Sequence, residues 1–312
     1  MELVLSTLHT AMRLTVPYLL ISLGGLLCYK SGIFNLALEG FTILGCFAAV
    51  AAARVTGNVF FAIVFSMLLT AVMGAIFAFF VLEFKVDPIV ASLAFNLIGE
   101  GLSRYLLSSV FGVSGRLVLD ASLELPVLDV PILASIPILG DIFNNLTSLA
   151  YVAILLVIVM HILLYKTKLG FQTRIIGLNE TAAISAGVNV NRVRYIGLIL
   201  GSAICGLAGA QLALSVRMFN VGMTSGRGWT AVVILMMADS KPVQTALLSL
   251  LFGVADALIM KLSGQSVASQ LLATIPYVLA FVITLIPLMT KRVRTANIRY
   301  NAKRTFLMKD QG

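Results

Sequence analysis

The chain has 312 residues, of which 60% are apolar and only 11% are charged. Because about one quarter of a soluble domain is charged, this composition excludes a water-soluble globular protein and indicates that lipid is the main solvent. The net charge of +9 would suit nucleic acid, but the lysines and arginines stand in short runs beside apolar blocks, as in membrane topology signals. We therefore expect one integral-membrane domain over residues 1–312 that binds no nucleic acid.

Apolar segments recur along the whole chain. A helix needs about 20 apolar residues to cross the hydrocarbon layer. Four blocks reach that length without an acidic or basic residue: Val55–Leu82, Ile142–Tyr165, Tyr195–Val216 and Leu262–Thr290. Four more are shorter or contain isolated charges: Leu14–Tyr29, Leu36–Ala53, Pro88–Val110 and Pro242–Met260. Together with the short block Trp229–Ala238, they predict an all-α polytopic bundle of about 8–10 membrane segments, some broken or re-entrant.

Charged loops indicate which side of the membrane each segment faces. Residues 166–194 contain five basic residues against Glu180 alone, so this loop is expected in the cytoplasm. The tail 291–312 has seven basic residues against Asp310; it is also expected inside, and could instead serve as a patch for anionic lipid headgroups. Residues 111–147 are rich in acids and prolines and predict a long, irregular extracytoplasmic loop. The side of the N-terminus depends on whether Ser31–Gly40 re-enters.

The first polar pair within the membrane sequence is Asn35 and Glu39, one helical turn apart. Polar residues are costly in lipid unless they are paired or wet, so they deserve a functional hypothesis. Ser31 and Gly32 permit a helix break just before the pair. We expect the pair to support a broken helix near a translocation pathway; alternatively, Glu39 holds a neighbouring helix or loop by binding the backbone amides of that element.

A second polar pair, Asn96 and Glu100, projects from one face of the segment Pro88–Val110, because the two residues are four apart. This stripe could line a cavity and bind a polar solute. It could equally face a partner subunit.

The loop 166–194 contains the pattern of a short capped helix. Asn179 is a suitable N-cap, and Glu180 favours the positive helix end. Small residues keep the helix slim, and glycine ends it. The predicted helix comprises Asn179, Glu180, Thr181, Ala182, Ala183, Ala186 and Gly187. Such a helix is suited to docking in a groove on another protein, although a solvated connector would have the same pattern.

Small residues recur every four positions on the next segment, at Gly197, Gly201, Cys205 and Gly209. This spacing is typical of close helix packing in membranes.

Three residues near the end of the apolar sequence also invite a role. Arg227 could engage acidic groups of a binding protein, and Trp229 could stack on the ring of an aromatic solute. A single tryptophan is also a common interfacial anchor. Asp256 is expected to pair with a neighbour or cap a helix, with ion coupling as the alternative.

Several kinds of site are missing from the sequence. It has no GxxxxGK[ST] phosphate loop. The two histidines, His9 and His161, have no neighbouring residues at the spacing of a metal site or a catalytic triad. Cys28, Cys46 and Cys205 lie in apolar runs without paired spacing. We therefore expect neither an enzyme nor a metal or cofactor site.

The loop sequence GLNETAAISAGVNVNRVRY resembles the coupling-helix region of ABC importer permeases of the ribose and branched-chain amino acid group, and is most similar to permeases of nucleoside importers of the basic-membrane-protein type. Further matches follow in family order: Thr15–Gly40, Ala91–Leu102 (ASLAFNLIGEGL), Met223–Leu235 (MTSGRGWTAVVIL), Phe252–Leu258 and Ile275–Tyr277. After Leu235 the chain reads MMADSKPVQTALL, where the family usually has an aromatic- and glycine-containing turn; this departure puts the packing of that hairpin in doubt.

The resemblance implies a permease subunit in the bacterial inner membrane, forming half of an alternating-access pathway for nucleosides. The implied partners are a cytoplasmic ATPase that uses ATP and Mg²⁺, a second and preferably different permease subunit, and an extracytoplasmic binding protein or lipoprotein. A ribose-like sugar or a branched-chain amino acid is the alternative solute. The rival from another class is an ion-coupled secondary transporter, although its usual internal repeat is not evident.

Overall fold

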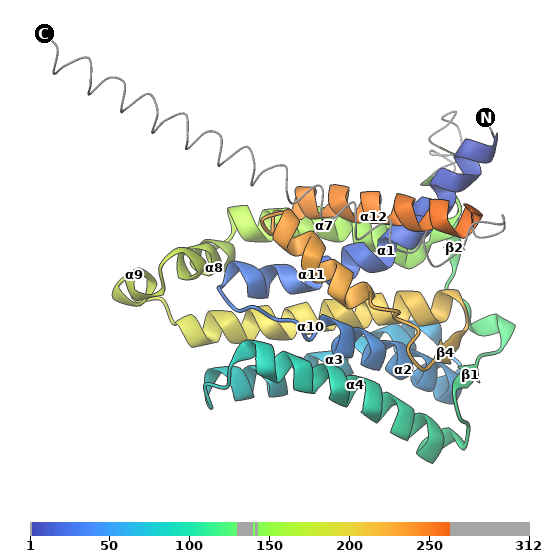
Figure 1. The fold of residues 1–312 in the computed structure, drawn as a ribbon, viewed down its shortest axis with the longest axis horizontal. Helices are drawn as coiled ribbons and strands as arrows, with labels where there is room; N and C mark the ends of the chain where they lie inside the picture. The colour runs from blue at the N-terminus through green and yellow to red at the C-terminus, as the bar shows by residue number, and fades with distance from the viewer. Residues whose placement is uncertain (1, 130–139, 141–142, 263–312) are drawn as a thin grey trace, which may run out of the picture. The chain divides into compact units, whose positions relative to one another are not determined.

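A computed structural model describes residues 2–129, 140 and 143–262 of the chain (Figure 1). The chain divides into two compact units, Met1–Lys261 and Leu262–Gly312, and every described residue except Leu262 belongs to the first. The predicted segment Leu262–Thr290, which includes Ile275–Tyr277, and the basic tail 291–312 lie outside the described residues.

Helices make up most of the first unit. Six of the described helices are long and apolar enough to cross a membrane: α1 (Glu2–Lys30), α2 (Leu38–Thr56), α3 (Val59–Leu82), α7 (Ser148–Lys166), α10 (Val190–Ser215) and α12 (Pro242–Leu262). Helix α4 (Pro88–Phe111) is as long but carries charged residues, and α11 (Arg227–Met237) is too short to cross alone. Helices α8 (Lys168–Leu178) and α9 (Glu180–Ser185) connect α7 to α10. The prediction of a polytopic helical bundle is confirmed.

The predicted segment Val55–Leu82 is wrong at its start. Helix α2 ends at Thr56, and Gly57 follows with a left-handed φ of 66°, which glycine adopts without strain. Asn58 then caps α3, because its side chain accepts a hydrogen bond from the Phe61 N–H at 3.2 Å. The break carries no charge, so a search for uncharged apolar stretches passes straight through it.

Two other helix starts differ from the predicted ones for local reasons. Helix α10 begins at Val190 instead of Tyr195, because Asn189 caps it by accepting a hydrogen bond from the Arg192 N–H at 3.0 Å. Helix α7 begins at Ser148 instead of Ile142, because the two residues before it form a strand.

The described part of the loop 111–147 includes short regular elements. It contains β1 (Arg116–Val118), a 3₁₀ turn η1 (Ala121–Leu123), β2 (Val127–Leu128) and β3 (Leu146–Thr147). Strand β1 pairs antiparallel with β4 (Met218–Asn220), about 100 residues further along the chain, and β2 pairs with β3. These short pairings satisfy backbone groups that a helix would otherwise pair internally.

The helices run between two distinct ends of the bundle, which we call the α9 end and the strand end (Figure 1). At the α9 end, Lys30 at the close of α1 forms an ion pair with Asp239 after α11, at 3.7 Å. At the strand end, Arg54 near the close of α2 forms an ion pair with Asp120, at 3.1 Å. The start of α1 lies at this end too, since His9 Nε2 is 3.2 Å from the Asn144 carbonyl.

Helix α2 begins part-way along the bundle. After α1 ends at Lys30, residues 31–37 run back without helical structure, and we call them the return segment. Its Leu36 meets Ser92 and Asn96 of α4. Asn96 is eight residues from the start of α4, hence about 12 Å along that helix. The predicted break at Ser31–Gly40 therefore places the N-terminus of α2 deep in the bundle.

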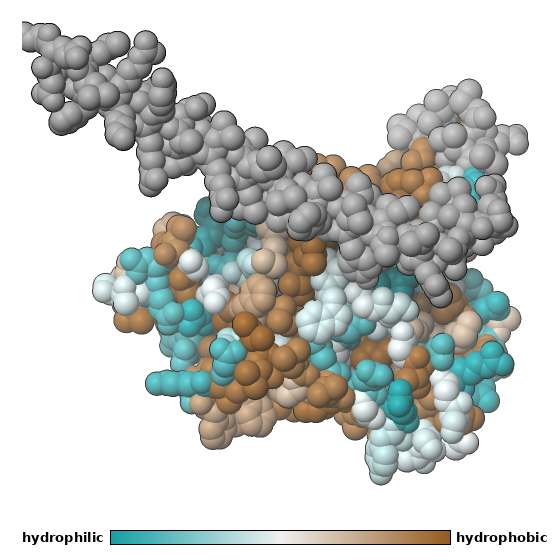
Figure 2. Space-filling view, in the orientation of Figure 1, coloured by the Kyte–Doolittle hydropathy of each residue, from teal (hydrophilic) through white to brown (hydrophobic). Residues whose placement is uncertain are grey.

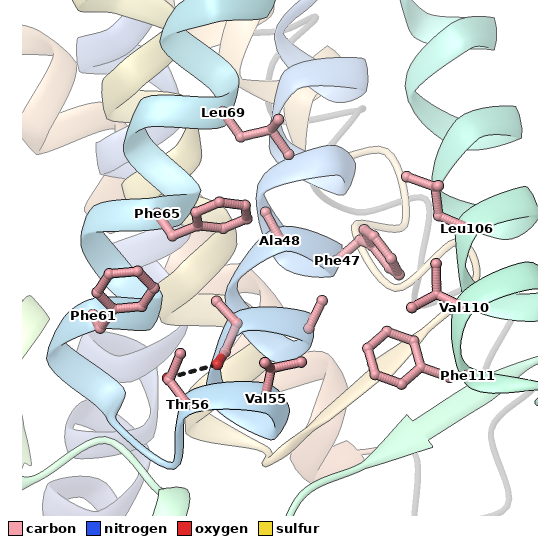
Figure 3. A pocket seen from close by; sticks show the side chains of 12 residues that line it. Phe47, Ala48, Val55, Thr56, Phe61, Phe65, Leu69, Leu106, Val110 and Phe111 are labelled. Carbon is pink, nitrogen blue, oxygen red and sulfur yellow. Dashed lines mark hydrogen bonds between the residues drawn. The ribbon is translucent and has the colours of Figure 1, made fainter.

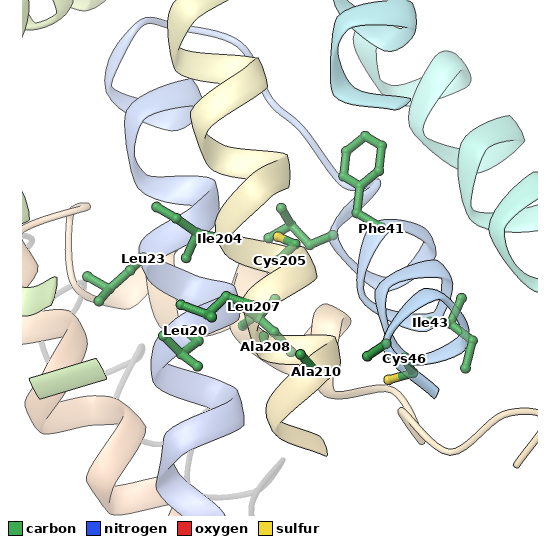
Figure 4. Packing of buried hydrophobic residues seen from close by; sticks show 14 of the residues in the cluster. Leu20, Leu23, Phe41, Ile43, Cys46, Ile204, Cys205, Leu207, Ala208 and Ala210 are labelled. Atoms are coloured by element: carbon green, nitrogen blue, oxygen red, sulfur yellow. The ribbon is translucent and has the colours of Figure 1, made fainter. Parts of the chain in front are cut away.

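Helix α10 is the central packing element, and Figure 4 shows its apolar side chains between α1 and α2. The backbones approach closely because small residues face each other: Gly24 of α1 lies against Gly201, and Gly45 of α2 lies against Gly206 and Gly209. The apolar side chains of α1, α2 and α10 form most of one buried cluster.

The outer helices expose large apolar side chains. Figure 2 shows apolar surface over α4, where exposed residues include Val90, Leu93 and Leu97. Similar residues are exposed on α3 and α7, among them Leu68 and Leu155. Such surface is suited to lipid or to another membrane subunit, as the composition predicts.

Candidate functional site

A cavity of about 280 Å³ lies where the N-termini of α2 and α11 meet α4. Four of the five residues predicted to line a pathway surround it, although they come from three separate helices. The lining consists of Glu39, Ile43, Asn96, Leu97, Glu100, Gly222, Thr224, Ser225, Gly226 and Trp229. A few polar side chains converge in a largely apolar wall where two helices begin inside the bundle, and this combination makes it the candidate functional site.

Glu39 joins α2 to the start of α11. One carboxylate oxygen accepts hydrogen bonds from the Thr224 hydroxyl at 2.5 Å and from the Gly226 N–H at 3.0 Å. The other accepts one from the Gly228 N–H at 2.5 Å. Backbone N–H groups at a helix N-terminus lack helical partners, so a carboxylate there satisfies them and complements the helix dipole. This arrangement matches the second expectation for Glu39, a hold on a neighbouring element through backbone amides.

Asn96 holds the return segment and the start of α2 against α4. Its amide donates to the Leu36 carbonyl at 3.0 Å, and its oxygen accepts from the Gly40 N–H at 2.7 Å. The Ser92 hydroxyl also accepts a hydrogen bond from the Leu36 N–H, at 2.9 Å. Gly40 and Gly99 bring the two backbones into direct contact beside these bonds.

Asn35 is not brought to the cavity. Its buried side chain accepts a hydrogen bond from the Ala37 N–H at 2.8 Å, so it stabilises the entry into α2. Asn35 therefore supports the break before α2, and its place near a translocation pathway stays a prediction.

Glu100 and Trp229 present accessible groups to the cavity. The Glu100 side chain is 53% exposed and forms one ion pair with Arg104, at 3.4 Å. Trp229 is 42% exposed. An accessible carboxylate and an aromatic face can bind the hydroxyl groups and the ring of a solute, respectively. By contrast, the hydrogen-bonding groups of Glu39 and Asn96 are largely engaged within the protein.

Thr224, Ser225 and Gly226 are lining residues that sequence reasoning missed. They lie in the MTSGRGWT block, immediately before Arg227. The family resemblance covers this block, but it does not assign Thr224–Gly226 to a cavity. A turn leading into a short helix within apolar sequence is the signal that could have found them, because its free N–H groups need partners.

Arg227 points back into the bundle. Its guanidinium donates to the Met223 and Thr224 carbonyls, at 3.3 and 3.2 Å, and lies 5.9 Å from the centre of the Tyr18 ring. The Tyr18 hydroxyl in turn donates to Asp256 at 2.7 Å, which agrees with the expected pairing of Asp256. These contacts stabilise the start of α11, and contact of Arg227 with a binding protein stays a prediction.

The predicted capped helix forms as α9. Asn179 caps it by accepting a hydrogen bond from the Ala182 N–H at 3.1 Å, and Gly187 follows the helix with a left-handed φ of 77°. Ala183 is fully buried against side chains of α8 and α10, namely Ile176, Val190 and Val193. The opposite face is exposed and consists of Thr181, Ala182, Ile184 and Ser185. Ala186 is the C-terminal cap.

The predicted small-residue stripe makes contact with two helices. Gly197 lies against Leu27 of α1, and Gly201 lies against Gly24. Cys205 approaches Gly24 as well, and Gly209 contacts the backbone of α2. The stripe therefore lies where α10 packs most closely.

A second cavity, of about 360 Å³, lies between α2, α3 and α4 near the strand end (Figure 3). Its lining is apolar apart from Thr56, and phenylalanines at 47, 61, 65 and 111 dominate it. Such a lining offers almost no groups to orient a polar solute, so it is a weaker candidate. Among the described residues, no group of three or more His, Cys, Asp or Glu side chains could hold a metal ion.

Comparison with known proteins adds a family assignment. Residues 7–288 match the family described as branched-chain amino acid transport system, permease component. The nucleoside ABC transporter permease NupC of Lactococcus lactis is 29% identical over 86% of this chain and 88% of its own length. The guanosine permease NupQ of Bacillus subtilis is 29% identical over 78% of each chain. The glucose permease TsgB13 of Haloferax volcanii is 30% identical over 77% of this chain and 65% of its own. No solved structure matches.

Proposed function

Because this chain belongs to the permease family of branched-chain amino acid transport systems, we propose that it forms half of the membrane pathway of an ABC importer for nucleosides. It is a multi-pass protein of the inner membrane, with six candidate spans among its described helices. The reaction is movement of a solute driven by ATP hydrolysis on another subunit. This chain contributes a gated path and performs no covalent chemistry.

The cavity at Glu39, Glu100 and Trp229 is the observation that carries the proposal. A nucleoside combines an aromatic base with ribose hydroxyls, and the cavity offers an exposed indole beside an exposed carboxylate. The base would stack on the indole, and the ribose hydroxyls would donate hydrogen bonds to the carboxylate. Neither contact requires the solute to carry a charge. In this scheme Glu39 and Asn96 keep the two helix N-termini in place while the solute passes.

The exposed face of α9 is the proposed docking surface for the ATPase subunit. The α9 end then faces the cytoplasm and the strand end faces outward, toward a substrate-binding protein. ATP and Mg²⁺ would be held by the ATPase. An ATPase that closes on ATP could move α9 as a unit with α8 and α10, because Ala183 is buried between them.

The second permease subunit is proposed to be a different chain. Lactococcus lactis has a further relative, the nucleoside permease NupB, which is 20% identical over 281 residues, and Bacillus subtilis has a further guanosine permease, NupP. Two distinct permeases in one organism support a heteromeric pathway, in line with the expectation from the sequence.

Uptake by cells lacking this chain tests the proposed solute. Loss of labelled guanosine and uridine uptake, restored by the wild-type chain, is the expected result. Loss of glucose uptake with intact nucleoside uptake would favour the sugar importer that TsgB13 suggests. Uptake that persists without the ATPase would overturn the ABC mechanism.

Co-purification of the ATPase with this chain tests the docking face. Ala182→Asp should reduce the bound ATPase by about tenfold or more, because an unpaired charge desolvated in an interface costs more than about 1.4 kcal/mol. Ser114→Asp is the matched control, since Ser114 is exposed in the loop after α4, at the strand end. Equal ATPase recovery from both variants would show that α9 is not the docking element.

A further inference from the structure

The Arg194 side chain links α9 to α10. Arg194 lies in the second turn of α10, and its side chain is only 14% exposed. Two guanidinium nitrogens donate to the two oxygens of Glu180, at 3.0 and 2.8 Å. This two-pronged pairing fixes both direction and distance, and it joins the first residue of α9 to α10.

The same guanidinium makes a third contact, to the return segment. Its Nε donates to the Ser31 carbonyl at 3.2 Å, 163 residues away in the sequence. Ser31 is the first residue after α1, and a Cβ added to Gly32 would lie 3.7 Å from the guanidinium. One side chain therefore joins the proposed ATPase-docking helix, α10 and the start of the return segment.

The return segment leads from this contact to the cavity. Its far end is held by α4 through Leu36, and Glu39 follows three residues later as the second residue of α2. Glu39 in turn holds the N-terminus of α11. A continuous path of bonded groups thus runs from Glu180 through Arg194 and the return segment to the cavity wall.

The physical properties of the return segment suit it to move. Residues 31–37 are not helical; most of their N–H groups bond one by one to the end of α1, to near neighbours and to Ser92, so no continuous helical ladder fixes the φ and ψ angles. Displacements in proteins are commonly absorbed by a few such residues between rigid helices. The helices on either side, α1 and α2, are tightly packed and would move as rigid bodies.

We infer that Arg194 is the positioning residue that transmits a displacement of α9 to the return segment and so to the cavity. This inference rests on the proposed function, in which the ATPase moves α9. Arginine is suited to the role because its planar guanidinium directs several N–H donors at once, whereas lysine offers a point charge. In Arg194 the two terminal nitrogens donate to Glu180, and Nε donates to the Ser31 carbonyl.

Arg194→Ala is the first test, in the intact transporter with its ATPase. Loss of a charge-assisted hydrogen bond shifts an equilibrium by about tenfold or more. We expect solute uptake per ATP hydrolysed to fall by about that factor, while ATPase co-purification and ATP hydrolysis are retained. Arg192→Ala is the matched control: Arg192 is an exposed arginine two residues earlier on α10. Equal uptake per ATP in the two variants would overturn the inference.

A charge exchange separates the two contacts of Arg194. Glu180→Arg combined with Arg194→Glu can rebuild an ion pair between α9 and α10, but it leaves a carboxylate, which cannot donate, opposite the Ser31 carbonyl. We expect the Tm to recover relative to Glu180→Arg alone, because the ion pair is rebuilt, with uptake per ATP still low. Full recovery of uptake would show that the contact with Ser31 is dispensable and would overturn the inference.

A direct readout of the cavity completes the test. Leu97 lines the cavity and is 73% exposed, so Leu97→Cys reports its accessibility to a thiol reagent. Trapping the ATPase with vanadate should change the labelling rate in the otherwise wild-type chain and leave it unchanged with Arg194→Ala. A change of equal size in both would overturn the inference. If the wild-type chain binds no ATPase at all, the proposed function fails instead, which keeps the two failures distinguishable.

Discussion

Glu39 makes more hydrogen bonds to the rest of the protein than Glu100, the other charged residue that lines the cavity. Its carboxylate accepts three hydrogen bonds, two of them from backbone N–H groups at the start of α11. Without it, those groups would lie inside the bundle with no helical partner. The acid is therefore a structural requirement of the interrupted helix, in addition to lining the cavity.

Replacing Glu39 should destabilise the protein. We expect Glu39→Ala to lower the free energy of unfolding by about 2–3 kcal/mol, because three charge-assisted bonds disappear and their donors lose a partner. Thermal unfolding of the purified protein in detergent measures the effect. Glu100→Gln is the control, since this exposed acid has one ion pair and its loss should cost less than about 1 kcal/mol. Equal shifts in Tm for the two variants would contradict the assigned role.

The α2–α4 contact depends on two glycines rather than on complementary side chains. Gly40 and Gly99 face each other so closely that a Cβ on Gly99 would collide with the carbonyl oxygen of Gly40. One turn earlier on α4, Asn96 forms hydrogen bonds with the Leu36 carbonyl of the return segment and with the Gly40 N–H of α2. The close approach of the backbones and the hydrogen bonds therefore support each other, because a wider gap between α2 and α4 would lengthen the hydrogen bonds of Asn96.

Gly99→Ala should separate α2 from α4, at a cost of about 1–3 kcal/mol. It should also reduce solute uptake, because α2 carries Glu39 to the cavity. Gly101→Ala provides a matched control on the same helix, where an added Cβ has open space. That variant should be neutral or stabilised by up to about 1 kcal/mol, as alanine is the better helix former. The opposite order in Tm would contradict the packing described.

Helix α9 shows what local sequence can predict. Its cap Asn179 and the glycine after it act through neighbouring backbone groups, so the pattern alone places the helix. The pattern does not tell which alanine is buried: Ala182 and Ala183 are equivalent in sequence, yet only Ala183 is enclosed by α8 and α10. That distinction depends on packing between helices and needed the structure.

Long-range partners could not be predicted in the same way. The sequence singled out Glu39, but its partner Gly228 is 189 residues away. Arg194 was counted only as a topology charge, because its contact with Ser31 spans 163 residues. The polytopic helical fold followed from composition, whereas the break at Gly57 depends on a backbone angle that composition does not report.

At the scale of the whole molecule, the two ends of the bundle should face opposite sides of the membrane. Asp120→Cys lies in the loop at the strand end and Ser185→Cys lies on α9; both positions are exposed. A thiol reagent that cannot cross membranes should label Asp120→Cys in intact cells and Ser185→Cys only after permeabilisation. The native cysteines Cys28, Cys46 and Cys205 are buried and contribute little background. The reverse labelling pattern would exclude α9 as an ATPase contact.

The accessible cavity has a consequence for symmetry. Trp229 and Glu100 remain exposed while lining it, so this chain supplies one wall and leaves room for another. Two identical subunits related by a two-fold axis would offer a solute the same groups from both sides. A nucleoside has no two-fold axis: its base and its sugar differ. A pair of unlike chains can offer each half of such a molecule a different surface, with one solute shared between the two subunits.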